Sequence, residues 1–307
     1  MAISIEDYFP HGGAPHIRVL GIDAPPLSAA VPDVADLDAA LTPVADLLAG
    51  KRIAALTGAG LSTDSGLADY RSPGRPPRHP ITLQQFMADP DWRQRYWARN
   101  HIGWRGPEHA EPNAGHKALA FLESLGVVVG VITQNIDRLH ERAGSRRVVD
   151  LHGRYDQVIC TQCGKRIART WLAREFDRLN PHWEIPGVHG MEFTPDADAE
   201  VENTGGFVVA PCPYCGGVLR PDVVFFGGSV HPEDYARGAE IIDDAQAVLV
   251  AGSSLAVGSA MRFVRQAHKD GKPIVVINRG ATKADKWAEY HVTAGTSEAL
   301  AWLADEL

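Results

Sequence analysis

The hydrophobic and polar positions of the chain follow two patterns, short apolar runs and helical repeats. Apolar or β-branched runs predict buried strands, and apolar residues spaced three or four apart predict amphipathic helices. The runs predict strands at 53–57, 126–133, 148–151, 223–226, 247–251 and 274–277. The repeats predict helices at 37–48, 84–87, 92–101, 118–125, 235–244, 257–268 and 297–307. Strands that alternate with helices predict an α/β fold with a doubly wound, parallel, Rossmann-like sheet.

Three segments depart from this alternation. Residues 1–34 are rich in Pro, Gly and Ala and predict an N-terminal extension. The segment from about 75 to 115 predicts a helical module, whose aromatic side chains are expected to form its core, with part of them as an alternative lining for an acyl pocket. Residues 154–217 predict a small module inserted between residues 35–153 and 218–307 of the Rossmann-like domain.

The charge and apolar content of the chain exclude some classes of partner. The formal net charge of the 307 residues is −8, so no basic field attracts nucleic acid or an anionic membrane. No apolar run approaches the length of a bilayer span. The first residues carry neither the basic nor the apolar region of a secretory signal. We therefore expect a cytoplasmic protein with no nucleic-acid or membrane partner.

The stretch 58–71, read as GAGLSTDSGLADYR, follows the first predicted strand. Gly58 and Gly60 allow a tight turn and a close approach to a ligand, as in loops that present N–H groups to a phosphate. Thr63 stands where the dinucleotide fingerprint has its third glycine, which weakens a hydride-transfer interpretation. The small and polar residues up to Asp69 predict a loop over a ligand rather than a crossover helix.

Polar or small residues also follow four other predicted strands. They are Gln134, Asn135, Ile136 and Asp137 after 126–133, His152 after 148–151, Gly252, Ser253 and Ser254 after 247–251, and Asn278, Arg279 and Gly280 after 274–277. The carboxyl ends of parallel strands face the ligand crevice of a doubly wound sheet. Residues 134–137 alone fit amide and ribose binding or a simple turn equally well. His152 has the side chain best suited to accept a proton near neutral pH, although a lone histidine is more often structural.

The four cysteines form two C-x-x-C pairs, Cys160 with Cys163 and Cys212 with Cys215. Each pair places two thiolates on one tight turn, and two such turns make a closed tetrahedral S4 site. This pattern favours one structural zinc over the alternatives of a redox dithiol or two disulfides.

These motifs together resemble the sirtuins, the NAD-dependent protein deacylases, from about Leu37 to Leu303. GAGLSTDSGLADYR, QNIDRLH, LHG, the double C-x-x-C, FFG, GSSLAV and NRG occur in the order of the family. The resemblance implies NAD contacts from Gly58, Ala59, Gly60, Ser62, Asp69, Tyr70, Arg71, Gln134, Asn135, Ile136, Asp137, Gly252, Ser253, Ser254, Asn278, Arg279, Gly280 and Thr296. It also implies catalytic roles for His152 and Asn135, with His152 as the general base.

The resemblance further implies that an acyl-lysine substrate strand pairs between residues 223–228 and the loop 252–257. The residues expected to contact it are Val224, Phe225, Phe226, Gly227 and Val257. The implied reaction transfers the acyl group from lysine to ADP-ribose and releases nicotinamide. YWARN at 96–100, AGSRR at 143–147 and RPDVVFFG at 220–227 resemble the class II, mitochondrial-type sirtuins and their bacterial relatives. That branch is associated with bulkier acyl groups and with ADP-ribosyl transfer.

Two other functions stay open from the sequence. One is a protein mono-ADP-ribosyltransferase that uses the same NAD site and leaves ADP-ribose on its target. The other belongs to a different class, a non-catalytic NAD-sensing, zinc-binding protein. His152 and Asn135, both intact, argue against this second alternative.

Overall fold

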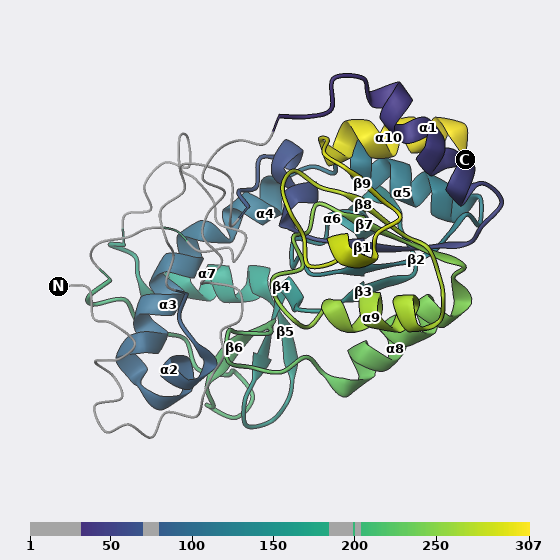
Figure 1. Cartoon of the computed structure of the whole chain (residues 1–307). Helices are drawn as coiled ribbons and strands as arrows, with labels where there is room; N and C mark the ends of the chain where they lie inside the picture. The colour runs from purple at the N-terminus through teal and green to yellow at the C-terminus, as the bar shows by residue number, and fades with distance from the viewer. Residues whose placement is uncertain (1–31, 70–79, 184–198, 200–203) are drawn as a thin grey trace.

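The computed structural model describes residues 32–69, 80–183, 199 and 204–307 (Figure 1). Its larger sheet has six parallel strands in the order β3-β2-β1-β7-β8-β9. Those strands are β1 (Ile53–Thr57), β2 (Val128–Thr133), β3 (Val148–Asp150), β7 (Ala247–Ala251), β8 (Ile274–Ile277) and β9 (Tyr290–Val292). A smaller antiparallel sheet has the order β5-β4-β6, with β4 (Gly153–Cys160), β5 (Arg166–Ala168) and β6 (Leu219–Val223).

Helices cover both faces of the larger sheet (Figure 1). Ile53 and Ala55 of β1 face one apolar cluster with α1 (Leu37–Leu48), α5 (Ala114–Ser124) and α10 (Thr296–Glu306). Ala54 and Leu56 face the other, with α8 (Pro232–Asp244) and α9 (Met261–Lys269). Because successive strand residues point to opposite faces, the strands other than β9 pack into both clusters, and Val292 of β9 packs into the first. This arrangement confirms the predicted doubly wound α/β fold.

The other helices either lie beside the smaller sheet or connect successive strands of the larger sheet along the chain. They are α2 (Leu83–Ala88), α3 (Pro90–Gly103), α4 (Arg105–His109), α6 (Leu139–Ala143), α7 (Arg169–Leu179) and the short 3₁₀ turns η2 (Ala59–Leu61), η3 (Thr63–Ser65) and η4 (Asp285–Trp287). Phe86 of α2, Trp97 of α3 and Phe176 of α7 pack against β4 and β6 in a third cluster, the aromatic core, which is separate from the two beside the larger sheet. Tyr96 and Trp97 of the predicted helical module therefore pack in this core, and Trp104 packs in a smaller cluster, whereas Trp92 is only partly buried and contacts Arg95.

The register of the larger sheet aligns the ends of its strands. Thr57 at the end of β1 is level with Thr133 of β2 and with Ala251 of β7. Asp150 ends β3 beside Thr133, and Ile277 ends β8 beside Ala251. The residues after these five strands therefore meet at one edge of the sheet. The strand order reverses its direction there, because β2 and β3 lie on one side of β1 and β7, β8 and β9 lie on the other.

Two boundaries predicted from the sequence are wrong, and three strands, β4, β5 and β9, were missed. The strand expected at 223–226 is β6, which ends at Val223 and pairs antiparallel with β4 in the smaller sheet, because Phe225 turns into the aromatic core. The helix expected at 257–268 begins only at Met261, after a turn. β9 escaped prediction because two of its three residues are exposed and give no apolar run.

The smaller sheet begins at Gly153 and ends at Val223, so it extends beyond both limits of the inserted module predicted for 154–217. The division of the chain into domains stays a prediction. Within the described ranges, no helix has both the length and the apolar character needed to cross a bilayer.

Candidate active site

The glycines of the first loop pack against the loop that follows β7. A Cβ atom added at Gly58 would lie 2.7 Å from Cβ of Ser253, and one added at Gly60 would lie 2.9 Å from the Gly252 carbonyl oxygen. Gly252 itself has a φ of +64°, and its added Cβ would lie 2.3 Å from the Leu61 nitrogen. The Gly60 N–H donates to the Gly252 carbonyl at 2.9 Å. Glycine is therefore needed at these positions because the backbones of the two loops approach each other closely, whether or not a ligand is bound.

Three predicted site residues form one buried hydrogen-bond network. The Asn135 side-chain amide donates to the Gly58 carbonyl and to Ser62 Oγ, both at 3.0 Å. Ser62 donates in turn to Asp137 Oδ2 at 2.6 Å, and the Leu139 N–H donates to Asp137 Oδ1 at 3.0 Å. Burial raises the pKa of Asp137, and these two hydrogen bonds oppose that rise. The network fixes the first loop against residues 134–137.

Gln134 joins the neighbouring loops. Its Nε2 donates to Ser253 Oγ at 2.5 Å and to the Thr57 carbonyl at 3.3 Å. Ser253 also accepts from the N–H of Leu255, which has a φ of +55° and so lies in the left-handed region. The side chains after β1, β2 and β7 thus interlock at the sheet edge, as their predicted positions require.

His152 lies next to this network, two residues beyond the end of β3. Its Nε2 lies 2.7 Å from Ser259 Oγ, and its carbonyl accepts from the Val224 N–H at 2.8 Å. Burial lowers the pKa of His152 to about 4, against a smaller opposite effect from a hydrogen bond with the Gln134 backbone. In the tautomer that donates from Nδ1 to the backbone carbonyl of Gln134, Nε2 is free to accept a hydrogen bond from the Ser259 hydroxyl. The imidazole is therefore neutral at pH 7, as a base must be.

Ser259 is a residue beside His152 that the sequence analysis missed. It lies in the turn before α9, two residues after Val257, and no strand end or glycine pair precedes it directly. Its only signal in the sequence is a hydroxyl in the loop after GSSLAV.

The residues after β8 are placed at the same edge but are partly engaged with one another. Asn278 Nδ2 donates to the carbonyls of Arg279 and Gly280 at 3.1 and 2.9 Å. The Arg279 guanidinium forms a two-point ion pair with Asp33, at 2.7 and 2.5 Å. Thr296 Oγ1 donates to the Gly60 carbonyl at 3.3 Å, which ties α10 to the first loop.

The expected substrate residues have unequal surroundings. Phe225 is buried, with its ring centroid 5.1 Å from that of Phe86, so its side chain belongs to the aromatic core. The Phe226 carbonyl accepts from the Leu83 N–H at 3.0 Å, and the Gly227 carbonyl accepts from Gln84 at 3.1 Å. Val257 is partly exposed beside the Ser254 loop. Of the expected NAD contacts, Tyr70 and Arg71 lie outside the described residues.

The cysteines converge at the end of the smaller sheet. All four Sγ atoms lie within 4.8 Å of one another, with Cys160 and Cys215 separated by 3.5 Å and Cys163 and Cys212 by 3.8 Å. A disulfide needs about 2.05 Å between sulfurs, whereas four thiolates about 2.3 Å from one zinc ion lie about 3.8 Å apart. Gly164 and Gly216, with φ of +69° and +74°, close the two turns. The residues therefore fit a structural zinc ion.

The segment that carries this site matches the model of a known protein family. Residues 58–259 match the model of the Sir2 family, from the first glycine loop to Ser259 and including His152 and all four cysteines. The chain belongs to the Sir2 family. It is 53% identical over 263 residues to an NAD-dependent protein deacetylase 1 of Mycobacterium avium, covering 85% of this chain and 93% of that protein.

Other sirtuins are also similar to this chain over most of their length. The NAD-dependent protein deacetylase 1 of Streptomyces coelicolor is 47% identical, with 87% of this chain and 90% of that protein covered. The NAD-dependent protein deacylase SIR4 of Monosiga brevicollis is 46% identical, with 78% and 79% covered. A solved structure of Sir2 with a p53 peptide and NAD⁺ has a TM-score of 0.67 at 27% identity, with 87% of this chain and 98% of that chain covered.

Proposed function

We propose that this sirtuin is an NAD-dependent protein-lysine deacylase. The observation that carries the proposal is the neutral His152 imidazole beside the interlocked loops after β1, β2 and β7. The curated relatives named above are deacetylases or a deacylase, and the solved Sir2 complex pairs a peptide with NAD⁺.

The proposed NAD site is the row of strand ends. Gly58, Ala59, Gly60, Ser62 and Asp69 supply the first loop, and Tyr70 and Arg71 continue it. Gln134, Asn135, Ile136 and Asp137 lie opposite, with Gly252, Ser253 and Ser254 and then Asn278, Arg279, Gly280 and Thr296 along the same edge. The aligned strand ends support this assignment. The Ser62–Asn135–Asp137 network would hold the loop in place for the dinucleotide.

The chemistry divides between the co-substrate and the chain. When bound, NAD supplies the ribose carbon that bonds to the acyl oxygen as nicotinamide leaves. His152 then removes the proton of a ribose hydroxyl at Nε2, after that nitrogen releases the Ser259 hydroxyl. The ribose oxygen would attack the acyl carbon, and the lysine amine would leave that carbon. A water molecule would then add there, and the bond between the acyl carbon and its original oxygen would break, which gives free lysine and an O-acyl-ADP-ribose. Asn135 orients the first loop through the Gly58 carbonyl.

The substrate strand is proposed to pair between residues 223–228 and the loop 252–257. Val224, Phe226, Gly227 and Val257 supply main-chain or surface contacts, whereas Phe225 supports them from the core. We also assign the chain to the class II, mitochondrial-type branch and its bacterial relatives, on YWARN, AGSRR and RPDVVFFG. Acyl groups bulkier than acetyl are then the expected substrates. Thiolate zinc ligands suit the reducing cytoplasm, where we place the protein.

A panel of acyl-lysine peptides tests the proposal. Peptides with acetyl, long-chain, dicarboxylic and lipoyl groups are incubated with NAD, and mass spectrometry follows loss of each acyl group. The expected result is NAD-dependent deacylation of at least one peptide, with nicotinamide and O-acyl-ADP-ribose formed in equal amounts. If nicotinamide is released while every peptide stays acylated and ADP-ribose stays on protein, the transferase alternative replaces the proposal.

A further inference from the structure

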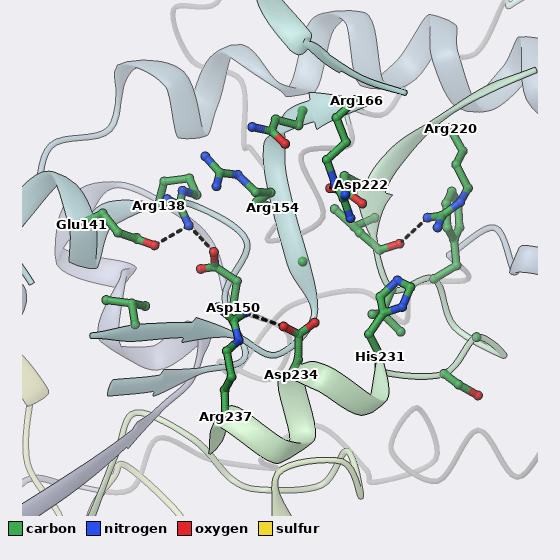
Figure 2. A pocket seen from close by; sticks show the side chains of 18 of the residues that line it. Arg138, Glu141, Asp150, Arg154, Arg166, Arg220, Asp222, His231, Asp234 and Arg237 are labelled. Carbon is green, nitrogen blue, oxygen red and sulfur yellow. Dashed lines mark hydrogen bonds and ion pairs between the residues drawn. The ribbon is translucent and has the colours of Figure 1, made fainter. Parts of the chain in front are cut away.

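A charged cavity of about 530 Å³ lies apart from the proposed NAD site. Its walls include residues of β3, β4, β5, β6, α6 and α8 (Figure 2). None of the residues proposed to hold NAD lines it. The cavity brings together segments from residue 83 to residue 237, so only the folded chain assembles it.

Arginine side chains dominate the walls of this cavity. Figure 2 shows them entering from several elements, and they outnumber the carboxylates that line it. The arginines are Arg138, Arg146, Arg154, Arg166, Arg220 and Arg237, and the carboxylates are Glu141, Asp150, Asp222 and Asp234. Arg154 is paired with Asp156, which does not line the cavity. The positive excess that remains contrasts with the net charge of −8 of the whole chain. A concave positive surface concentrates anions.

Two of these guanidinium groups have no carboxylate partner among the described residues. The half-buried Arg220 donates through one nitrogen to the carbonyls of Pro221 and Val223, at 3.0 and 3.1 Å. The exposed Arg146 has no hydrogen bond or ion pair through its side chain in the described part of the chain. In contrast, Arg166 Nε lies 2.8 Å from Asp222 and is neutralised. Arg220 and Arg146 are therefore the groups that a bound anion would pair with.

Two carboxyls of the wall are engaged with an arginine other than Arg146 and Arg220. Glu141 and Asp150 share the guanidinium of Arg138 (Figure 2). Burial, together with repulsion from Glu141, raises the pKa of Asp150, whereas Arg138 and Arg154 oppose that rise. This pair of carboxyls is therefore held at Arg138 and does not neutralise Arg220 or Arg146.

The cavity borders the segment proposed to receive the substrate strand. Val224, Phe225 and Gly228 form part of its wall, and the Val224 N–H bonds to the carbonyl of the catalytic His152. A substrate chain on residues 223–228 would thus bring its flanking side chains to the arginines. A guanidinium matches a carboxylate in shape and charge.

We infer that this cavity binds acidic side chains of the substrate protein that flank the acyl-lysine. The inference rests on the proposed function and names its substrate class, an acyl-lysine in an acidic stretch. Arg220 provides the inner contact and Arg146 the outer one.

Two acyl-lysine peptides that differ only in Glu and Asp or Gln and Asn at the flanking positions test the inference. The wild-type protein should give the acidic peptide a kcat/KM about fivefold higher. Arg220→Gln and Arg146→Gln should each reduce that ratio to below about twofold and leave the neutral peptide unchanged. Arg265→Gln removes an exposed guanidinium of α9 that does not line the cavity, and it should keep the full ratio.

Charge reversal strengthens the test. Because Arg146 is exposed and its side chain has no partner in the described ranges, Arg146→Glu should fold normally. It should shift the preference toward a peptide with flanking Lys residues. An acidic preference that survives in both Gln variants would overturn the assignment to this cavity.

Other outcomes separate the inference from the proposed function. Equal kcat/KM for the acidic and neutral peptides, with both deacylated, would overturn the inference and leave the deacylase proposal intact. If no peptide is deacylated, fluorescence anisotropy still measures whether the acidic peptide binds better and whether Arg220→Gln removes that preference. Stabilisation by inorganic phosphate that Arg220→Gln abolishes, with equal peptide binding, would replace the inference with a site for small anions.

Discussion

Strands β1, β7 and β8 of the larger sheet are buried at every position, whereas β5 of the smaller sheet is exposed at both ends and β6 is only partly buried. The larger sheet has helices and an apolar cluster on each face. The smaller sheet has one core, into which Cys160 and Cys212 pack beside the aromatic side chains. Apolar burial holds the first region together, and the second depends in addition on its cysteines.

The two regions meet at the proposed base. Gly153, next to His152, pairs with Val223 of β6, while the preceding strand β3 belongs to the larger sheet. The larger sheet therefore sets where His152 lies, and the smaller sheet sets the segment that faces it. Changes to the two regions should have separable effects.

Removal of the metal should have the largest effect. Structural zinc contributes about 10 kcal/mol or more to the folding of small metal domains, so Cys163→Ser or chelation should unfold the smaller sheet and abolish activity. The larger sheet should keep its melting transition, which calorimetry would resolve as a separate peak. One shared transition that moves as a whole would show that the two regions are not independent.

His152→Ala should remove the chemistry and leave both regions folded. Loss of a general base lowers kcat about 10²–10⁴-fold, measured as nicotinamide release with the preferred peptide. The melting temperature should stay near that of the wild type. His268→Gln, which changes an exposed histidine stacked on Trp287, serves as the control and should retain full activity. Retained turnover in His152→Ala would remove His152 from the proposed mechanism.

Gly252→Ala should weaken the larger sheet at its functional edge. The new Cβ combines a left-handed φ with an overlap against the Leu61 nitrogen, which together cost about 2–4 kcal/mol of unfolding free energy. Gly271→Ala is the matched control, because Gly271 has a φ of +67° with nothing within 4 Å of its added Cβ. It should lose only about 1 kcal/mol in urea unfolding. Equal losses in the two variants would contradict the packed contact between the loops.

Ser259→Ala should have the smallest effect, a shift in pH dependence. Ser259 Oγ lies 2.7 Å from Nε2 of His152, and a hydroxyl that donates to this nitrogen favours the neutral imidazole over the charged one. Its removal should raise the pKa of His152 from about 4, moving the acid limb of kcat/KM upward by about one pH unit or less. Activity at pH 8 should change little. Ser259→Thr keeps the hydroxyl and should restore the profile; an acid limb that stays in place in Ser259→Ala would exclude the contact.

Much of the fold and the candidate site could be predicted from the sequence, because the features concerned are local. Apolar runs marked every strand of the larger sheet except β9, and an apolar repeat marked α1. Polar residues after the strands indicated the functional edge, and the register brings them together. The C-x-x-C spacing predicted the cysteine cluster.

Other features depend on contacts between distant segments, and the sequence carries no local signal for them. Phe225 follows an apolar strand pattern, yet it turns into a core shared with Phe86 and Tyr96. Asp33 pairs with Arg279 across most of the chain. The hydroxyl of Ser259 reaches His152 only because the turn before α9 folds over the end of β3.

The sequence by itself determined the parallel α/β sheet, the family of the chain and the chemical types of residue at the strand ends. Spacing and residue type suffice for these, because strands, turns and thiolate pairs form from neighbouring residues. Only the tertiary structure decided the protonation of His152, which depends on burial, and the charge of the arginine-lined cavity, which depends on which side chains face one another. Burial and the distance between charges are properties of packed space, and they exist only once the chain has folded.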